Sequence, residues 1–310
     1  MLLEGLLFAL RSWVPRGPPP EPVAPTPMGS PAPPPPPEIS PPRAGECLTT
    51  HPLHLGVGPP PRYLSIVQHN SLGSWDQFLS LCNSFACTKC PPDIVCLQDP
   101  PFWRSRLPAF QNYIPFAPPG VTGNKPKVAF YVSSILLAQA TVLPAFFDWT
   151  DVVALHVFGV DLFGKSFSHF RILNLYNLWT KRTSQMRVSP LVAFPAPSCP
   201  TLVVGDFNIH HPLPDPLRSH SAEELVTSFP YFSRYSELGF GLVNQPGVYT
   251  RFPLGGSGQP SVLDLSFASL SLLPFCQTWD TPLPSTGTDH VPVEIILSHP
   301  FNSPPPPSPN

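Results

Sequence analysis

The residues best suited to chemistry are polar side chains that come directly after short apolar runs. Asn70 follows one such run, Asp99 follows the next, and Tyr176 and Asn177 follow a later one. A side chain at the end of a strand is carried by a rigid element and projects into a cleft, which is how proteins hold metal ions and phosphate groups in place. The pattern therefore predicts a site for metal or phosphate chemistry.

The second half of the chain is richer in such residues. Asp206 and Asn208 lie two residues apart after an apolar run, so on an extended chain their side chains project toward the same face. Three further polar residues precede the last apolar run: Thr288, Asp289 and His290. Asp264 lies within an apolar run, where a buried carboxylate without a partner would be costly. We therefore expect Asp264 to have a partner in the folded protein.

Strands must position these side chains, and the sequence contains eight apolar runs long enough to form them. Most of the runs are continuous rather than alternating in polarity, which predicts strands that are covered on both faces. The predicted strands are residues 63–68, 93–98, 127–133, 152–158, 171–177, 201–206, 262–268 and 291–297.

Two segments predict helices, because each begins with a capping pattern. Ser74 precedes Gln77 by three residues, and Ser221 precedes Glu224 by three residues. In such a pair the first side chain caps the helix and the second bonds back to it. Apolar residues follow in both segments, so each pattern predicts the start of an amphipathic helix.

Strands outnumber helices in this interpretation, and irregular connections that contain proline separate them. Pro230 is expected to break or kink the second helix, and Gly239 is expected to end it. The sequence therefore predicts an α/β (α+β) protein with layered mixed sheets and helices outside, rather than a doubly wound parallel sheet.

Composition narrows the class of protein. The chain has 310 residues, 50 of them proline, and a formal net charge of −2. So much proline excludes an all-helical bundle. Each apolar stretch is cut by proline, glycine or a charged residue before it approaches the roughly 20 residues of a membrane-spanning helix. A soluble protein without a membrane partner is expected.

Segments rich in proline are predicted to bound a single folded domain. Residues 1–61 and 299–310 cannot bury enough apolar area to offset the entropy of ordering them, so both are expected to be disordered. The first is interpreted as a spacer in part polyproline II, with docking on an SH3-like or WW-like protein as the less favoured alternative. Residues 62–298 remain as the domain.

The N-terminus and the cysteines bear on the compartment. The first ten residues are apolar but contain Glu4 and no basic residue, which makes a poor secretory signal. Seven cysteines, an odd number without regular spacing, agree better with reduced thiols than with disulfides. An intracellular location is expected.

In chain order, the polar residues and their neighbours form six motifs that resemble those of the endonuclease/exonuclease/phosphatase superfamily. They are Gln68-His69-Asn70, Ile94-Val95-Cys96-Leu97-Gln98-Asp99, Asn174-Leu175-Tyr176-Asn177, Gly205-Asp206-Phe207-Asn208, Leu263-Asp264-Leu265 and Thr288-Asp289-His290. Each motif alone is weak, but six in family order are specific. Within the superfamily the chain looks most like the endonuclease domain of fungal non-LTR retrotransposons, because Val248-Tyr249-Thr250 precedes a glycine-rich stretch and Asp264.

The resemblance implies a DNase I-like fold, a four-layer sandwich of two mixed β-sheets flanked by helices. It also implies a nuclear endonuclease that cleaves phosphodiester bonds in DNA with Mg²⁺, for which Mn²⁺ may substitute. The chemistry agrees, because attack of water on an anionic phosphate needs a cation to neutralise charge and a base to activate the nucleophile. Mg²⁺ takes oxygen ligands, which suits one or two carboxylates.

The resemblance assigns roles to individual residues. Asp206 would activate the attacking water, and Asn208 and Tyr176 would contact the phosphate. His290 would stabilise the transition state, with its ring held by Asp264. The implied metal ligands are Asn70, Asp99 and Asp289. The implied substrate contacts are Asn177, Thr250 and Thr288.

Asp99 departs from the family pattern, which usually has a glutamate at this position. The shorter side chain retracts the carboxylate by about one methylene, so the metal must shift, bind through water or be held less well.

The sequence also leaves two other functions open. One is a superfamily phosphatase acting on a small phosphoester, although the Lys and Arg expected in its substrate loops are scarce. The other is an inactive retrotransposon remnant that serves only as a binding module.

Overall fold

The computed structural model describes residues 63–88, 90–118, 125–137, 140–143, 151–158, 169–177, 196–256, 258–283 and 287–298. The two proline-rich segments predicted at residues 1–61 and 299–310 lie outside them, so those predictions stay open. Within the described residues, all eight predicted strands are present, with boundaries that differ by at most two residues. No described helix is both long enough and apolar enough to cross a bilayer.

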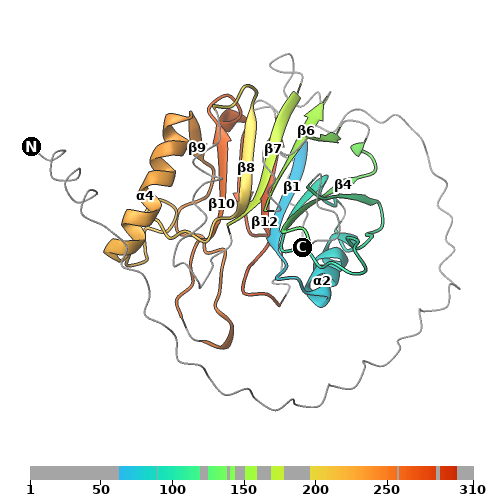
Figure 1. Ribbon diagram of the computed structural model, residues 1–310, viewed down its shortest axis with the longest axis horizontal. Helices are drawn as coiled ribbons and strands as arrows, with labels where there is room; N and C mark the ends of the chain where they lie inside the picture. The colour runs from blue at the N-terminus through green and yellow to red at the C-terminus, as the bar shows by residue number, and fades with distance from the viewer. Residues whose placement is uncertain are drawn as a thin grey trace, which may run out of the picture. The chain divides into compact units, whose positions relative to one another are not determined.

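The first sheet, within the described residues, has six strands in the order β11-β12-β1-β2-β4-β3 (Figure 1). The strands are β1 (Tyr63–Asn70), β2 (Ile94–Gln98), β3 (Tyr113–Phe116), β4 (Val128–Ser133), β11 (Cys276–Asp280) and β12 (Val293–Ser298). β1 and β2 run parallel, and the other described neighbours run antiparallel. The parallel pair places the ends of both strands, next to Asn70 and Asp99, at the same edge of the sheet.

The second sheet repeats this plan, with six described strands in the order β5-β6-β7-β8-β10-β9. They are β5 (Ala140–Val142), β6 (Val152–Phe158), β7 (His169–Tyr176), β8 (Thr201–Asp206), β9 (Phe240–Leu242) and β10 (Asp264–Ser269). β7 and β8 are the parallel neighbours here, and their register pairs Tyr176 with Asp206. Both sheets are therefore mixed, as predicted, and each delivers polar strand ends to one edge.

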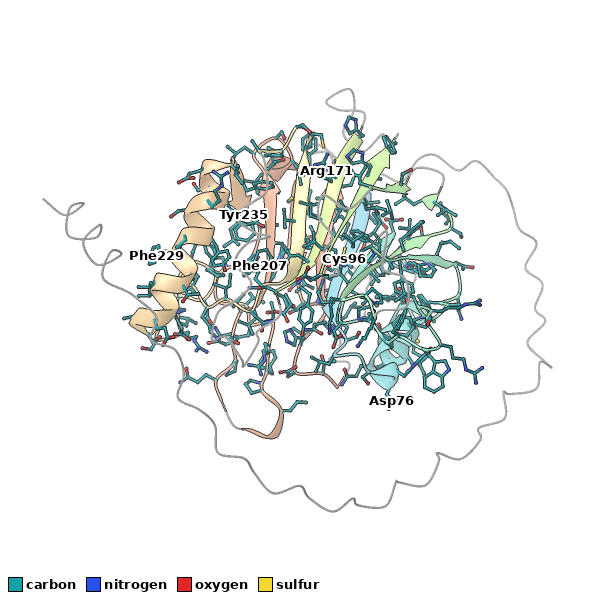
Figure 2. The ribbon with its side chains drawn as sticks, in the orientation of Figure 1. Asp76, Cys96, Arg171, Phe207, Phe229 and Tyr235 are labelled. Carbon is teal, nitrogen blue, oxygen red and sulfur yellow. The ribbon has the colours of Figure 1, made fainter. Side chains whose placement is uncertain are left out.

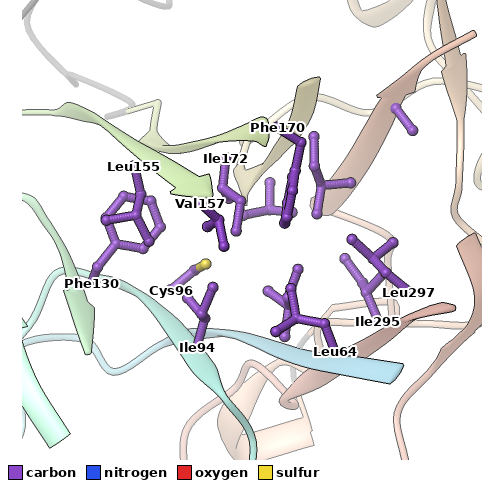
Figure 3. Packing of buried hydrophobic residues seen from close by; sticks show 14 of the residues in the cluster. Leu64, Ile94, Cys96, Phe130, Leu155, Val157, Phe170, Ile172, Ile295 and Leu297 are labelled. Carbon is purple, nitrogen blue, oxygen red and sulfur yellow. The ribbon is translucent and has the colours of Figure 1, made fainter. Parts of the chain in front are cut away.

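The main hydrophobic core lies between the two sheets (Figure 3). Leu64, Ile94 and Phe130 of the first sheet pack in one cluster with Leu155 and Ile172 of the second, and none of these side chains is exposed. Fully burying an aliphatic side chain of this size contributes about 1.5–3 kcal/mol. The continuous apolar runs of the sequence are thus explained by strands buried in the interior of the sandwich.

One long helix covers the outer face of each sheet (Figure 1). Phe78, Leu81 and Phe85 of α2 (Trp75–Ala86) pack on the first sheet. On the second sheet, Tyr235 of α4 (Ala222–Glu237) lies 6.2 Å from Phe207 between ring centroids (Figure 2). Helix, sheet, sheet and helix form the predicted four-layer sandwich. Two 3-10 turns, η3 (Leu254–Gly256) and η4 (Leu273–Phe275), complete the described elements.

The helix caps agree in part with the sequence. At α4, Ser221 accepts from the backbone of Glu224 while the Glu224 side chain accepts from the backbone of Ser221, so the predicted capping box is complete. At α2, Ser74 accepts from the Gln77 backbone, but the Gln77 side chain donates to the carbonyl of Gly287 instead of returning to Ser74. That bond ties the start of α2 to the loop before β12.

Pro230 does not break the helix, so the expectation of a break there is wrong. Helix α4 continues through Pro230 to Glu237. Proline removes one backbone donor, but Tyr231 and Tyr235 are both 2% exposed and hold the following turns against the sheet. Gly239 ends the helix as predicted, with a φ of 77° that is reached at little cost only by glycine.

Candidate functional site

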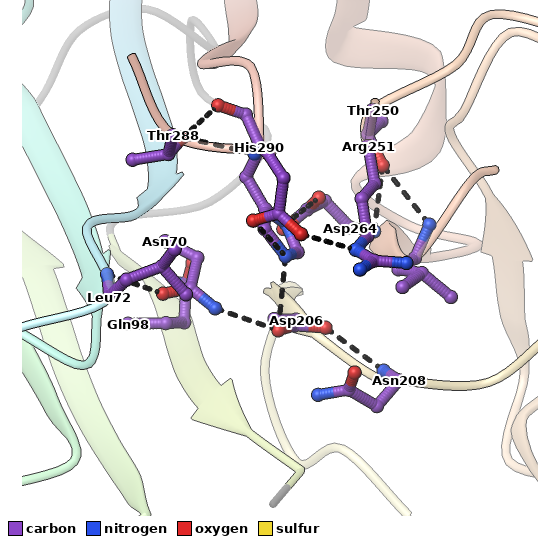
Figure 4. Close-up of polar contacts among 12 residues, drawn as sticks. Asn70, Leu72, Gln98, Asp206, Asn208, Thr250, Arg251, Asp264, Thr288 and His290 are labelled. Atoms are coloured by element: carbon purple, nitrogen blue, oxygen red, sulfur yellow. Dashed lines mark hydrogen bonds and ion pairs between the residues drawn. The ribbon is translucent and has the colours of Figure 1, made fainter. Parts of the chain in front are cut away.

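Two loops are locked together beside the edge at which β1, β7 and β8 end. One contains Thr250 and Arg251, and the other contains Asp289 and His290. The backbone N–H of Phe252 donates to the backbone carbonyl of Asp289, and the backbone N–H of Val291 donates to the backbone carbonyl of Thr250. These bonds fix the short loop before β12 and hold His290 beside Asp206 and Asp264 (Figure 4).

Asp206 lies at the centre of the site and is 1% exposed. The Asn70 side-chain amide donates to its Oδ2 at 2.8 Å, and the backbone N–H of Asn208 donates to its Oδ1 at 3.0 Å. Burial raises the pKa of Asp206 above its usual range, and the Asp264 carboxylate adds to this, while the His290 imidazole and the two hydrogen bonds oppose it. Asp206 is therefore a carboxylate with more affinity for protons than an exposed one, as a general base requires.

His290 lies against three carboxylates. Its Nδ1 is 2.8 Å from Asp264 Oδ2, while its Nε2 is 3.9 Å from Asp206 Oδ2 and 3.8 Å from Asp289 Oδ1. Burial by itself would lower the pKa of His290, but Asp264 and Asp206 together raise it to about 9. The ring is therefore an imidazolium at neutral pH, and its Nε2–H has no acceptor within hydrogen-bond distance among these carboxylates.

Asp264 has the partner that its buried position required. Besides His290, the Gln68 side chain donates to its Oδ1 at 3.3 Å. The Thr250 hydroxyl accepts from the backbone N–H groups of Leu263 and Asp264, each at 3.0 Å. Asp264 is thereby fixed in position as the orienting group for the imidazole.

Asp289 faces the same space with one oxygen engaged and one free. Arg251 Nε donates to its Oδ2 at 2.7 Å. The other oxygen, Oδ1, is buried and has no hydrogen-bond partner within the part of the chain described. A buried carboxylate oxygen without a donor is the kind of atom that a cation satisfies.

Besides burial, the predicted metal ligand Asp99 contributes to the raised pKa of the Tyr176 phenol in the cavity, and Asp99 is itself paired with lysines. Its Oδ1 is 2.8 Å from Lys125 Nζ and 3.7 Å from Lys127 Nζ, and its backbone has a φ of 44°. It is not among the described residues that line the cavity over Asp206. The structure thus pairs this predicted metal ligand with lysines rather than bringing it together with Asp289.

The predicted phosphate and substrate contacts divide into two groups. Tyr176 and Asn208 line the cavity, and burial raises the pKa of the Tyr176 phenol, which keeps it protonated as a donor. The Asn177 side chain donates to the Phe207 carbonyl, and the Thr288 hydroxyl bonds to the backbone N–H and carbonyl of His290. The hydrogen bonds of Asn177, Thr250 and Thr288 stabilise the backbone around the site. Contact of these three side chains with substrate stays a prediction.

Sequence reasoning missed several residues that shape the site. Arg251 and Lys125, which bind the two acidic side chains, lie in loops without any periodic signal. Asn174 bridges the two sheets, since its amide donates to the carbonyls of Leu97 and Ala129 at 3.0 and 2.9 Å and accepts from Gln98 at 2.6 Å. Asn174 belongs to the third sequence motif, but its role between the sheets was not predicted, although a lone asparagine inside an apolar run was the signal for it.

A cavity of about 470 Å³ opens over these groups, lined among others by Asn70, Tyr176, Asp206, Asn208, Asp289 and His290. The side chains around Asp206 in this cavity offer carboxylate and amide oxygens, which fit Mg²⁺, an ion that keeps several waters and takes one or two carboxylates. Asp289, whose Oδ1 accepts no hydrogen bond among the described residues, and Asn70, whose Oδ1 accepts one from the Leu72 backbone N–H and retains a second lone pair, are the residues that would hold it. No cluster of three or more His, Cys, Asp or Glu with metal-binding geometry occurs among the described residues.

Comparison with solved structures agrees with the fold. The endonuclease domain of TRAS1, a telomere-specific non-LTR retrotransposon, is 13% identical with a TM-score of 0.57, covering 77% of this chain and 99% of that one. An AP endonuclease from Leishmania major is 15% identical with a TM-score of 0.59, covering 77% and 89%. The Xenopus laevis APE2 catalytic domain is 13% identical with a TM-score of 0.54, covering 77% and 94%.

Sequence comparison gives the family. No curated protein matches the chain in sequence. The model of the endonuclease/exonuclease/phosphatase family matches residues 68–290, a span that begins in the motif of Asn70, ends at His290 and includes the whole cavity. With a match over more than half of its length and a DNase I-like sandwich to carry it, the chain belongs to the endonuclease/exonuclease/phosphatase family.

Proposed function

We propose that this protein is a metal-dependent phosphodiesterase that nicks DNA, and therefore acts in the nucleus. The observation that carries the proposal is that one cavity holds both a proton acceptor and a positively charged group. Asp206 is a buried carboxylate suited to accept a proton, and the His290 imidazolium 3.9 Å away is suited to face an anion. Phosphodiester hydrolysis needs both: a base for water and positive charge for the phosphate.

The reaction begins with the phosphodiester in the cavity. His290 Nε2–H, the Asn208 amide and the Tyr176 hydroxyl donate to its non-bridging oxygens. Asp206 takes a proton from a water molecule, whose oxygen attacks phosphorus while the bond to the leaving oxygen breaks, and the leaving oxygen takes up a proton from solvent. Asp264 holds the His290 ring so that Nε2–H keeps pointing at the phosphate. Asp289 and Asn70 would hold a divalent cation, which would supply further positive charge against the pentavalent transition state.

Polymeric substrate is favoured over a small phosphoester by the charge of the cavity wall. A phosphatase site for a multiply phosphorylated molecule needs several free cationic side chains. Arg251 is the single Arg or Lys in the described lining, and it is engaged by Asp289. The structural neighbours, which include a retrotransposon endonuclease domain and an AP endonuclease, agree with DNA as the substrate.

One observation favours a second candidate, an inactive module that binds DNA without cleaving it. The Asp99 carboxylate is paired with Lys125 at 2.8 Å, so one of the three predicted metal ligands is occupied by a lysine. Binding of DNA with no cleavage at any metal concentration is the outcome that would distinguish this candidate from the enzyme.

The test is nicking of supercoiled plasmid with Mg²⁺, with Mn²⁺ and with EDTA. We expect open circular DNA with either metal, none with EDTA, and at least about 100-fold less from Asp206→Asn. Asp280→Asn is the matched control, because Asp280 is an exposed aspartate on β11, and it should nick normally. Nicking that persists in EDTA or in Asp206→Asn would overturn the proposal.

A further inference from the structure

A second cavity, of about 430 Å³, lies on the chain segments that leave Asn70 and Asp99. Its described lining is Trp75, Trp103, Arg104, Arg106, Leu107 and Pro108. We propose that it binds an unpaired nucleotide of the DNA strand beside the cleavage site, with the base stacked on tryptophan and the adjoining phosphate held by arginine. This inference rests on the proposed function and names the form of DNA that the enzyme recognises.

A strained turn presents the first aromatic ring. The backbone groups of Trp103 and Arg106 bond to each other in both directions, at 3.0 and 2.9 Å, and so close a two-residue turn. Its central residues, Arg104 and Ser105, have φ values of 48° and 61°. This left-handed geometry normally takes Asn-Gly, and non-glycine residues that are forced into it cluster at binding sites.

The turn leaves Trp103 61% exposed, with the Arg104 guanidinium 6.0 Å from the ring centroid. Trp103 and Trp75 line one cavity together, and an exposed apolar patch rimmed by polar residues marks an interaction site. A ring with a guanidinium close to it combines a surface for stacking with a fixed positive charge. Trp103 therefore has the two features that a nucleotide, with its planar base and anionic phosphate, would use.

The second ring stands on a rigid element. Trp75 is the first residue of α2, is 41% exposed, and contacts the buried Phe78 edge-on with ring centroids 6.2 Å apart. Since Phe78 is part of the core beneath the helix, the indole is held rather than free to swing. Two presented indoles form a more selective site for flat ligands than a single one.

The positive charge of Arg104 and Arg106 indicates that the ligand of the second cavity is anionic. Neither Arg104 nor Arg106 forms an ion pair with a carboxylate within the described residues, so both guanidinium groups are available to phosphate. Aromatic faces next to unpaired cations are the chemistry with which proteins bind single-stranded nucleic acid. In a fully paired duplex the base faces are stacked on each other, so only an unpaired base can use the indoles.

The cavity is close enough to the catalytic residues for one strand to reach both. The Gln77 side chain, two residues after Trp75, donates to the carbonyl of Gly287 in the loop that carries His290. Trp75 is three residues after Leu72, which lines the catalytic cavity. A strand with its phosphate at His290 therefore brings a nucleotide only a few positions away to the indoles.

The test measures DNA binding by the full chain in EDTA, where cleavage does not interfere. The probes are a labelled duplex with a short single-stranded gap and the same duplex fully paired, at one salt concentration. Trp103→Ala should weaken binding of the gapped duplex about 10-fold, the scale of one lost stacking contact, and leave the paired duplex nearly unchanged. Trp103→Phe should keep most of the affinity. Phe229→Ala, which removes a 51% exposed ring on α4, is the matched control (Figure 2).

Equal loss for both duplexes, no loss in Trp103→Ala, or no binding of the gapped duplex by the wild type would each overturn the inference. Arg104→Ala gives an independent readout, since removal of one phosphate contact should reduce the slope of log affinity against log salt by about 1. The outcomes remain separate from those of the nicking test. A wild-type protein that nicks plasmid but ignores the gap contradicts only this inference, and one that binds the gap but never nicks contradicts only the proposed function.

Discussion

Two acidic clusters of the site are built in opposite ways. In the Asp206–Asp264–His290 cluster, each side chain is at most 5% exposed and is positioned by the others or by backbone donors. In the Asp99–Lys125–Lys127 cluster, side chains are 18–36% exposed and the carboxylate is held only by flexible lysines. The buried cluster that moves protons is assembled in advance, whereas Asp99, one of the three predicted metal ligands, is held by partly exposed lysines.

The difference follows from burial. A buried ion pair is held in one geometry because separating it leaves an uncompensated charge, which typically costs 3–5 kcal/mol on removal of one partner. A partly exposed Lys–Asp pair has a median value of about 0–1 kcal/mol. A more strongly bound cation can therefore replace the lysines at Asp99, whereas the ion pair between Asp264 and His290 stays intact.

The largest expected effect comes from breaking the buried cluster at His290. His290→Ala should lower the single-turnover rate of plasmid nicking at least about 100-fold, because the charge that faces the phosphate is lost. DNA binding, measured by filter retention, should fall much less. A folded His290→Ala protein, as judged by circular dichroism, that nicks at the wild-type rate would show that the imidazolium has no part in the reaction.

A smaller effect with a distinct signature is expected from Asp264→Asn. The substitution keeps the size of the side chain but removes the charge that raises the pKa of His290. The rate should fall about 10- to 100-fold, and the alkaline limb of the pH profile should move below about 9, since the imidazolium then loses its proton earlier. An unchanged alkaline limb would mean that Asp264 acts only in packing.

The smallest effects are expected in the exposed cluster. Lys125→Met should raise the affinity for Mn²⁺ by up to about 5-fold, the range of a surface ion pair, if lysine and metal compete for Asp99. Asp99→Asn should lower that affinity and impair cleavage, and Asp99→Glu should maintain or improve cleavage. Electron paramagnetic resonance of free Mn²⁺ gives the affinity without reference to activity. Identical affinities in the wild type and in Lys125→Met would exclude the competition.

The sequence predicted the interior strands because their signal is physical and local. Continuous apolar runs arise where both faces of a strand are covered, as in β1, β2, β7 and β8. The four strands that were not predicted, β3, β5, β9 and β11, are the edge strands of the two sheets. They are short or partly exposed, and β3 contains Pro115, so hydrophobic periodicity had little to detect.

The sequence predicted which residues form the buried cluster of the site, but it did not predict all of the contacts around them. Asp206, Asp264 and His290 come together because strand ends and loop anchors fix them. The pairing of Asp99 with Lys125, and of Asp289 with Arg251, depends on loops whose course no local pattern records. The same reason explains Pro230, where packing of Tyr231 and Tyr235 outweighs the local preference of proline against a helix.

The central claim is that Asp206 acts as carboxylate while His290 is protonated, and the pH dependence of single-turnover nicking tests it most directly. The account predicts a bell-shaped profile. The rate should rise as Asp206 loses its proton, above the ordinary carboxyl value of 3.8, and fall as His290 loses its proton near pH 9. A rate that stays constant through pH 10, or that increases there, would contradict the account.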